Sequence, residues 1–290
     1  MRTTEQAVPL DDGDLAVTAW GDAAATPVVA VHGITANGRS FGRVAAELAA
    51  GVSPIPLLAP DLRGRGRSRD LPGPYGLGRH VDDLIALLDH RGVDRTVLAG
   101  HSMGAFVACL AAVRHPDRIA GAVLVDGGYG LRVPAGTDIR AVLGPAMARL
   151  DMVFAGADAY REFWRAHPAF AGRWTPEIDA YVLRDLIGEP PEMRSACVPE
   201  AVRADGAQVL EDPETLDAVH RLPCPARLLW AARGLMDESP GLYTPHLLSS
   251  LADSGIGLVE LADDNHYSVL FSAAAAVVAA QIRAVVQEVM

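Results

Sequence analysis

The chain has 290 residues, of which 36 are acidic and 25 are basic, so its formal net charge is −11. Half of the residues are hydrophobic and 21% are charged, proportions that exclude intrinsic disorder and fit a globular protein with a sizeable core. The acidic balance disfavours nucleic-acid binding, and the complete absence of lysine excludes Schiff-base chemistry and a P-loop phosphate site.

Short apolar runs rich in Val, Ile and Leu alternate with longer segments of helical period, which is typical of βαβ units and a mostly parallel sheet. Most of these runs are almost continuously apolar, as strands buried on both faces should be. In chain order, the sequence predicts strands at 15–20, 28–32, 55–59, 96–99, 122–125, 226–231 and 256–261. It predicts helices between them at 41–50, 77–90, 105–115, 242–251 and 273–289.

One interval, between the strands predicted at 122–125 and 226–231, breaks this alternation. About one hundred residues are too many for a connecting loop in a compact domain. Shorter segments inside it have helical patterns, at 142–154, 159–166 and 176–186. We therefore expect a helical cap at 130–222, inserted into a core that consists of 1–129 and 223–290.

The sequence Gly100-His101-Ser102-Met103-Gly104 lies directly between a predicted strand and a predicted helix. In this context the G-x-S-x-G pattern indicates a sharp turn that exposes the serine hydroxyl, with glycines where a Cβ would clash. An ordinary turn serine is the alternative interpretation, but the strand-turn-helix setting favours a nucleophile. The Met103 amide would begin the helix, where the positive end of the helix dipole favours a developing oxyanion.

Together with three further motifs, this pattern makes the sequence resemble the α/β-hydrolase superfamily, in which the four motifs follow one another in the same order. The three further motifs are His32-Gly33-Ile34, the segment DLRGRGRS at 61–68, and Asn265-His266-Tyr267. The resemblance implies an α/β-hydrolase fold with a helical cap inserted after the sixth strand. It also implies that the Ile34 amide is the second oxyanion donor beside Met103. We expect the arginines at 63, 65, 67 and 69 to lie on a solvated loop.

A serine nucleophile needs a base, and a neutral imidazole suits this role near neutral pH. Of nine histidines, only His266 is expected on a loop at the carboxyl end of a strand, where the sites of open α/β sheets gather. His32 is interpreted as structural. Its position suggests that it holds the turn that carries the oxyanion donor.

The acid that orients the imidazole has more than one candidate. Family members supply it after either the sixth or the seventh strand. Asp126 directly ends the strand predicted at 122–125, whereas Asp237 lies three residues beyond the position expected after the later strand. We predict Asp126, with Asp237 as the main alternative and Asp263 or Asp264 as lesser ones.

These residues predict a serine hydrolase that cleaves a carboxylic ester or lactone of a mostly apolar, medium-sized molecule. Trp164, Trp174 and Tyr267 are the predicted substrate-binding residues, because ligand pockets are mostly apolar. The resemblance leaves two alternatives: a carbon-carbon bond hydrolase or perhydrolase with the same triad, and a receptor-like protein that only binds a ligand. A serine in the elbow disfavours the dehalogenases and epoxide hydrolases, whose nucleophile is an aspartate.

No cofactor and no metal are expected, and three widely spaced cysteines indicate neither a disulfide framework nor a cysteine zinc site. The first residues lack the apolar core of a secretory signal, and the apolar stretch at 273–280 is too short to span a bilayer. We therefore expect a cytoplasmic bacterial protein without membrane contact. A monomer and a homodimer remain equally compatible with the sequence.

Overall fold

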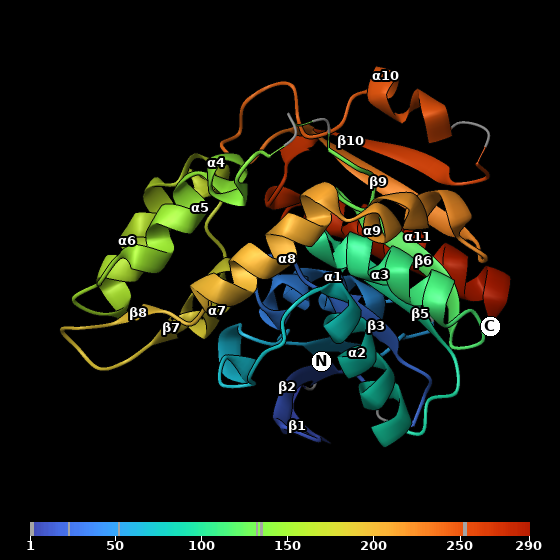
Figure 1. Ribbon diagram of the computed structural model, residues 1–290, viewed down its shortest axis with the longest axis horizontal. Coiled ribbons are helices and arrows are strands. Elements are labelled where there is room, and N and C mark those ends of the chain that lie inside the picture. Colours follow the sequence, from blue (N-terminus) through green and yellow to red (C-terminus); the bar gives the residue numbers. More distant parts are fainter. Residues whose placement is uncertain (1–2, 23, 52, 132, 134–135, 252–253) are drawn as a thin grey trace.

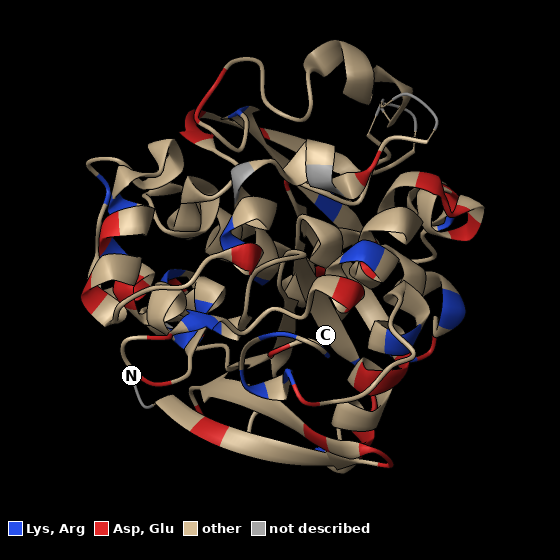
Figure 2. Cartoon of the chain, turned by 60° about the vertical axis from the view of Figure 1, so that its left-hand side comes forward, with Lys and Arg blue, Asp and Glu red and all other residues tan. Residues whose placement is uncertain are grey.

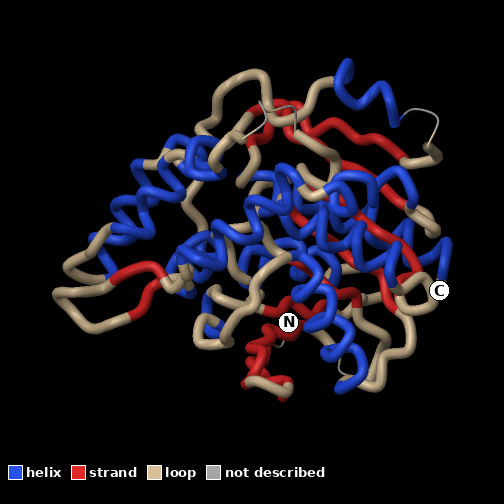
Figure 3. Tube along the Cα trace, in the orientation of Figure 1, coloured by secondary structure: helices blue, strands red, loops and turns tan. Residues whose placement is uncertain are grey.

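The computed structural model describes residues 3–290 except 23, 52, 132, 134–135 and 252–253. The predicted core and the predicted cap each include some positions outside the described residues. Helices cover both faces of one eight-stranded sheet (Figures 1 and 3), whose strand order is β1-β2-β4-β3-β5-β6-β9-β10. All neighbouring pairs from β4 to β10 are parallel, whereas β2 pairs antiparallel with both of its neighbours, β1 and β4. The prediction of an α/β fold with a mostly parallel sheet is confirmed.

All seven predicted strands are present, and the sheet contains one more, the edge strand β1. Its sequence TTEQAVPL has a single buried residue, Val8, so no continuous apolar run marks it. The central strands β3, β4, β5 and β6 are buried along their whole length, as their sequences predict. The strands of the sheet are β1 Thr3–Leu10, β2 Gly13–Trp20, β3 Val28–Val31, β4 Leu57–Pro60, β5 Thr96–His101, β6 Ile119–Val125, β9 Ala226–Arg233 and β10 Gly257–Asn265.

Two layers of helices bury the apolar faces of the sheet. One hydrophobic cluster joins it to α1 and α11, which pack against each other, and another joins it to α2, α3 and α10. Each of these helices lies within a few residues of its predicted position. They are α1 Gly42–Ala49, α2 Leu77–His90, α3 Met103–Arg114, α10 Pro245–Leu248 and α11 Ala274–Val289.

The segment between β6 and β9 is mostly helical and divides into two parts. Helices α4 to α7 and a short antiparallel pair of strands lie on the left of Figure 1. Helices α8 and α9 return to the core, where α9 contacts α3. The elements are α4 Ile139–Leu143, α5 Pro145–Ala148, α6 Ala157–Ala166, α7 Pro176–Arg184, β7 Leu186–Ile187, β8 Arg194–Ser195, α8 Pro199–Glu211 and α9 Pro213–Asp217.

Charged residues lie mainly on helices and loops, and segments of both signs occur on both sides of the view in Figure 2. Many of them form ion pairs, such as Arg114 with Glu214 and Arg161 with Asp179. Throughout the described ranges, no helix is both long enough and apolar enough to cross a bilayer.

Candidate active site

Three parallel strands deliver the candidate catalytic residues to one edge of the sheet. Ser102 follows β5, Asp126 follows β6, and His266 follows β10. The carboxyl ends of parallel strands meet at the same edge, which is where open α/β sheets bind ligands. Residues far apart in the chain are thereby brought together.

Ser102 lies in a strained turn between β5 and α3. Its φ of 54° and ψ of −123° lie in a backbone region that residues other than glycine rarely adopt. The neighbouring glycines allow this turn, because a Cβ on Gly100 would lie 2.2 Å from the Gly104 oxygen and one on Gly104 would lie 2.0 Å from the Val31 oxygen. The amide of Ser102 donates to the Val125 oxygen at 2.9 Å, which ties the turn to β6.

Asp126 and His266 form a buried hydrogen-bonded pair. The Nδ1 of His266 lies 2.6 Å from the Oδ2 of Asp126, and the Ala231 amide donates to Oδ1 at 3.0 Å. Asp126 is fully buried and has a positive φ of 45°. The structure therefore brings together the predicted base and the predicted acid.

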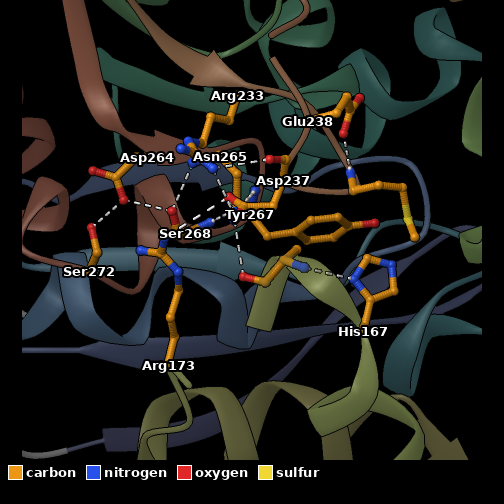
Figure 4. A network of polar contacts seen from close by, with 12 residues as sticks. His167, Arg173, Arg233, Asp237, Glu238, Asp264, Asn265, Tyr267, Ser268 and Ser272 are labelled. Carbon is orange, nitrogen blue, oxygen red and sulfur yellow. Dashed lines mark hydrogen bonds and ion pairs between the residues drawn. The ribbon is translucent and has the colours of Figure 1, made fainter. Parts of the chain in front are cut away.

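The alternative acids have other partners (Figure 4). Asp237 accepts a hydrogen bond from the Nδ2 of Asn265 at 3.0 Å and pairs with Arg233 at 3.3 Å. Asp264 accepts hydrogen bonds from the hydroxyls of Ser268 and Ser272, both at 2.6 Å. Asp263 is exposed. None of the bonds found for these three carboxylates within the described ranges goes to His266.

A second histidine, His101, packs against the ring of His266 with ring centres 4.8 Å apart. Its Nε2 donates to the His266 carbonyl at 2.8 Å, which fixes the backbone of the candidate base. Burial holds the pKa of His101 well below its usual range, so the ring stays neutral. It therefore places no competing charge beside His266.

The turn after β3 carries Ile34, the predicted second oxyanion donor, and His32 holds it. The Nδ1 of His32 donates to the Gly33 oxygen at 2.7 Å, and its Nε2 accepts from the Leu62 amide at 2.8 Å. Burial lowers the pKa of His32 to about 3, so the ring is neutral and can fill both roles. Within the described part of the chain, neither the Ile34 amide nor the Met103 amide has a protein acceptor.

Two buried arginines hold the carbonyls of the same turn. The Nε of Arg65 donates to the Ile34 oxygen at 3.0 Å, and Nη2 of Arg149 donates to the Thr35 oxygen at 3.1 Å. The expectation of a solvated arginine loop is therefore wrong for Arg63 and Arg65, which are both fully buried. Each is neutralised by aspartates that lie far from it in sequence, Asp83 and Asp205, so the pattern of the loop alone could not show it.

Two cavities meet at Ser102 and have Ile34, Leu143, Leu235 and His266 in common as lining residues. We call the first the aromatic cavity and the second the aliphatic cavity. The walls of the aromatic cavity include Thr35, Ser40, Tyr181, Tyr267, Leu270 and Phe271. Those of the aliphatic cavity include Met103, Phe106, Ile139, Val142, Val209 and Leu242.

Of the three predicted substrate-binding residues, Tyr267 is the one found among the described residues that line the two cavities at Ser102. Trp164 is 2% exposed and packs inside the insertion against Tyr160 and Phe170. Trp174 packs on the guanidinium of Arg165. Trp164 and Trp174 therefore lie outside the walls of the two cavities at Ser102, although the ring of Trp164 also contacts that of Tyr267, with centres 6.3 Å apart.

Sequence reasoning missed Ser40, Leu143 and Tyr181, which line the aromatic cavity, and Arg149 behind it. Ser40 follows the HG turn by seven residues, and this closeness was the one available signal. In the described part of the chain, no three His, Cys, Asp or Glu side chains gather as metal ligands would.

Comparison with known proteins identifies a family and several relatives of this chain. Residues 28–280 match the model of the alpha/beta hydrolase family. Lipase LipV of Mycobacterium tuberculosis is 35% identical over 177 residues, which are 61% of this chain and 64% of the lipase. The aligned part is thus just under two thirds of that relative's length.

Epoxide hydrolase A of the same organism is 30% identical over 247 residues, which cover 83% of this chain and 70% of that enzyme. The crystal structure of a hypothetical protein from Pseudomonas aeruginosa PAO1 superimposes with a TM-score of 0.74 at 25% identity and covers 98% of this chain and 99% of its own. Since the family model spans most of the sequence and the sheet is mostly parallel, the chain belongs to the alpha/beta hydrolase family.

Proposed function

We propose that the protein is a serine hydrolase that cleaves a carboxylic ester or lactone through an acyl-enzyme. The observation that carries this proposal is the buried 2.6 Å contact between His266 and Asp126 beside the strained Ser102. A pure binding protein needs neither a strained nucleophile nor a buried carboxylate on an imidazole.

In this mechanism the Ser102 hydroxyl attacks the carbonyl carbon while Nε2 of His266 takes its proton. Asp126 holds the ring through Nδ1 and stabilises the imidazolium that forms. The Ile34 and Met103 amides, which have no protein acceptor in the described structure, receive the oxyanion. His266 then protonates the leaving alcohol, and water attacks the acyl-enzyme with His266 as its base.

The insertion acts as a lid in this proposal, because Ile139, Val142 and Leu143 of its first helix line the cavities at Ser102. An apolar cover excludes water, which strengthens the electrostatic interactions that stabilise the transition state. Cleavage of an epoxide through a covalent ester needs a carboxylate nucleophile, and a serine stands in that place here.

The test is turnover of aryl esters and a panel of lactones, including a resorcylic macrolactone, by the wild type and by Ser102→Ala. We expect hydrolysis by the wild type and a loss of roughly three to six orders of magnitude in kcat for the variant, as for other triad nucleophiles. Ser272→Ala, which lies outside both cavities, should keep its activity. No Ser102-dependent turnover of any ester or lactone would refute the proposal.

A further inference from the structure

The two cavities at Ser102 differ in the hydrogen-bonding capacity of their walls. In the aromatic cavity, Ser40 is 2% exposed and its hydroxyl has no partner among the described residues. Buried hydroxyls without a partner are rare and cost free energy. An unsatisfied hydroxyl in the wall of a cavity therefore points to a polar group on the molecule that enters it.

Ser40 is held firmly in place. Its amide donates to the Asn37 oxygen at 3.1 Å within the short 3-10 helix Gly38–Phe41. The Asn37 side chain accepts from the Arg39 amide at 3.1 Å and donates to the Tyr181 oxygen at 3.0 Å. The hydroxyl thus lies on a rigid support that needs little further ordering when a ligand binds.

The rest of the aromatic cavity suits a neutral ring. Tyr181, Tyr267 and Phe271 line it, and the rings of Tyr181 and Phe271 have centres 5.3 Å apart, a separation typical of aromatic contacts. No arginine is among the described residues that line it, so it offers no partner for an anionic substituent. The polar group that Ser40 receives is therefore a neutral donor or acceptor, such as a phenolic hydroxyl.

The aliphatic cavity has no comparable group. Its one hydroxyl outside the catalytic residues belongs to Tyr243, and that hydroxyl already donates to the Tyr129 oxygen at 2.6 Å. The other described side chains of the wall, apart from Ser102, Asp126 and His266, are apolar. A polar group placed there would lose its hydrogen bonds to water without replacement.

We propose that the substrates are esters that join a hydroxylated aromatic group, bound in the aromatic cavity with its hydroxyl on Ser40, to a hydrocarbon chain in the aliphatic cavity. This inference rests on the proposed function, since it assigns the two sides of the same scissile ester. Ser40 is a specificity-determining residue in it, and Ser102, where the cavities meet, attacks the bond between the two groups.

The experiment compares kcat/KM for matched esters with and without a ring hydroxyl. One set is hexyl benzoate with its 3- and 4-hydroxylated forms, and the other is 2-phenylethyl hexanoate with its 3- and 4-hydroxyphenyl forms. For each set, the ratio of hydroxylated to plain ester is measured in the wild type, in Ser40→Ala and in Ser53→Ala. Ser53 is exposed and lines neither cavity, so it is a matched control.

We expect Ser40→Ala to lower the ratio roughly five- to tenfold in at least one set, the size of one hydrogen bond, while Ser53→Ala leaves it unchanged. A change of less than twofold in both sets would overturn the assignment of Ser40. In that case, Ser102-dependent hydrolysis of the plain esters would still support the proposed function. Failure of the Ser40 assignment is therefore distinguishable from failure of the serine-hydrolase proposal.

The aliphatic cavity has its own arm of the experiment. Val209→Phe and Leu131→Phe each place a larger side chain in this cavity, from two different segments of the chain. The result therefore does not depend on one variant folding well. We expect both to shift the preferred alkyl chain toward shorter lengths across a series from two to ten carbons. An unchanged chain-length profile in both variants would contradict the placement of the hydrocarbon.

Discussion

The backbone conformation of Asp126 explains how a residue directly after β6 reaches the ring of His266. Its φ of 45° turns the side chain toward His266 while its amide still donates to the Leu229 oxygen at 2.7 Å. Asn and Asp tolerate this region better than other side chains do. The carboxylate is thus fixed at both of its oxygens, by the imidazole and by the Ala231 amide.

Asp126→Asn should therefore keep the backbone geometry and lose the charge that orients His266. We expect kcat to fall by roughly three to four orders of magnitude, because the amide favours the wrong imidazole tautomer. Asp237→Asn should lower kcat by less than roughly tenfold, since that carboxylate pairs with Arg233 and Asn265. Steady-state kinetics on one ester measures both, and a larger loss in Asp237→Asn would reverse the assignment.

His32 makes the stability of the fold depend on pH. Its pKa is lowered to about 3 in the folded protein, against 6.5 in the unfolded chain, so the unfolded state binds one more proton between these values. The stability that the neutral ring contributes is present above pH 6.5 and is lost as the pH falls toward 3. His101, whose pKa burial also lowers, acts in the same direction.

His32→Asn removes this titration and serves as the test. Chemical denaturation between pH 6 and pH 5 should show a free energy of unfolding that falls more steeply for the wild type, by about 1 kcal/mol per pH unit. The variant itself should be less stable at pH 7, since asparagine cannot make both hydrogen bonds of the ring. Equal slopes for the two proteins would mean that His32 is protonated in the fold.

At the scale of elements, Arg149 ties the insertion to the turn after β3. Its guanidinium donates to the Thr35 oxygen, to the Tyr160 hydroxyl at 2.6 Å and to the Ser195 hydroxyl at 2.9 Å, and it pairs with Asp185. These partners come from β8 and from segments next to α7 and within α6. One buried cation therefore fixes several short elements that have little regular structure of their own.

Arg149→Met should leave the Asp185 carboxylate buried without its partner and lower the free energy of unfolding by roughly 3–5 kcal/mol. Adding Asp185→Asn should restore part of this loss, because the two changes are coupled. Arg161→Met, which breaks a more exposed pair with Asp179, should cost less than about 1 kcal/mol. Thermal unfolding of Arg149→Met, Asp185→Asn, their double variant and Arg161→Met measures this, and additive losses in the double variant would show that the buried pair is not coupled.

The elements that the sequence predicts well are those in which burial is continuous. Apolar runs in the sequence mark the strands around Val29, Leu98 and Val123, and an apolar stripe marks α2. Because the strands are parallel, the residues that follow them are expected at one edge of the sheet. Edge strand β1 lacks such a pattern. Within the insertion, composition could not separate aromatic residues that pack, such as Trp164, from those that face a cavity, such as Tyr181, because both are apolar and regularly spaced.

For the whole molecule, the insertion and the core share one hydrophobic cluster. Val202 and Val209 of α8 belong to the same cluster as Phe106 and Leu110 of α3. The predicted boundary at residue 222 therefore separates segments that bury each other. Buried apolar surface of this kind stabilises both the insertion and the core, so we expect each to lose stability when the other is removed.

Replacement of residues 130–222 by a short Gly/Ser linker is thus expected to expose the apolar face of α3. We expect the remaining core to lose its cooperative thermal unfolding or to aggregate, whereas an insertion that is only a lid would leave it folded. Differential scanning calorimetry distinguishes these outcomes. A sharp transition near that of the full protein would show that the core is independent.

The position of Asp126 has a consequence for engineering this scaffold. The carboxylate lies only four residues before Gly130, where the insertion is predicted to begin, whereas Ser102 and His266 are held by β5 and β10. A chimera that exchanges lids between relatives must place its upstream junction within the stretch 127–130, where a Cβ on Gly127 would lie 2.2 Å from the Ser102 oxygen. Lid exchange would therefore place a junction directly beside Asp126, the proposed catalytic acid, and the tolerance of that junction would decide how far substrate specificity can be transferred.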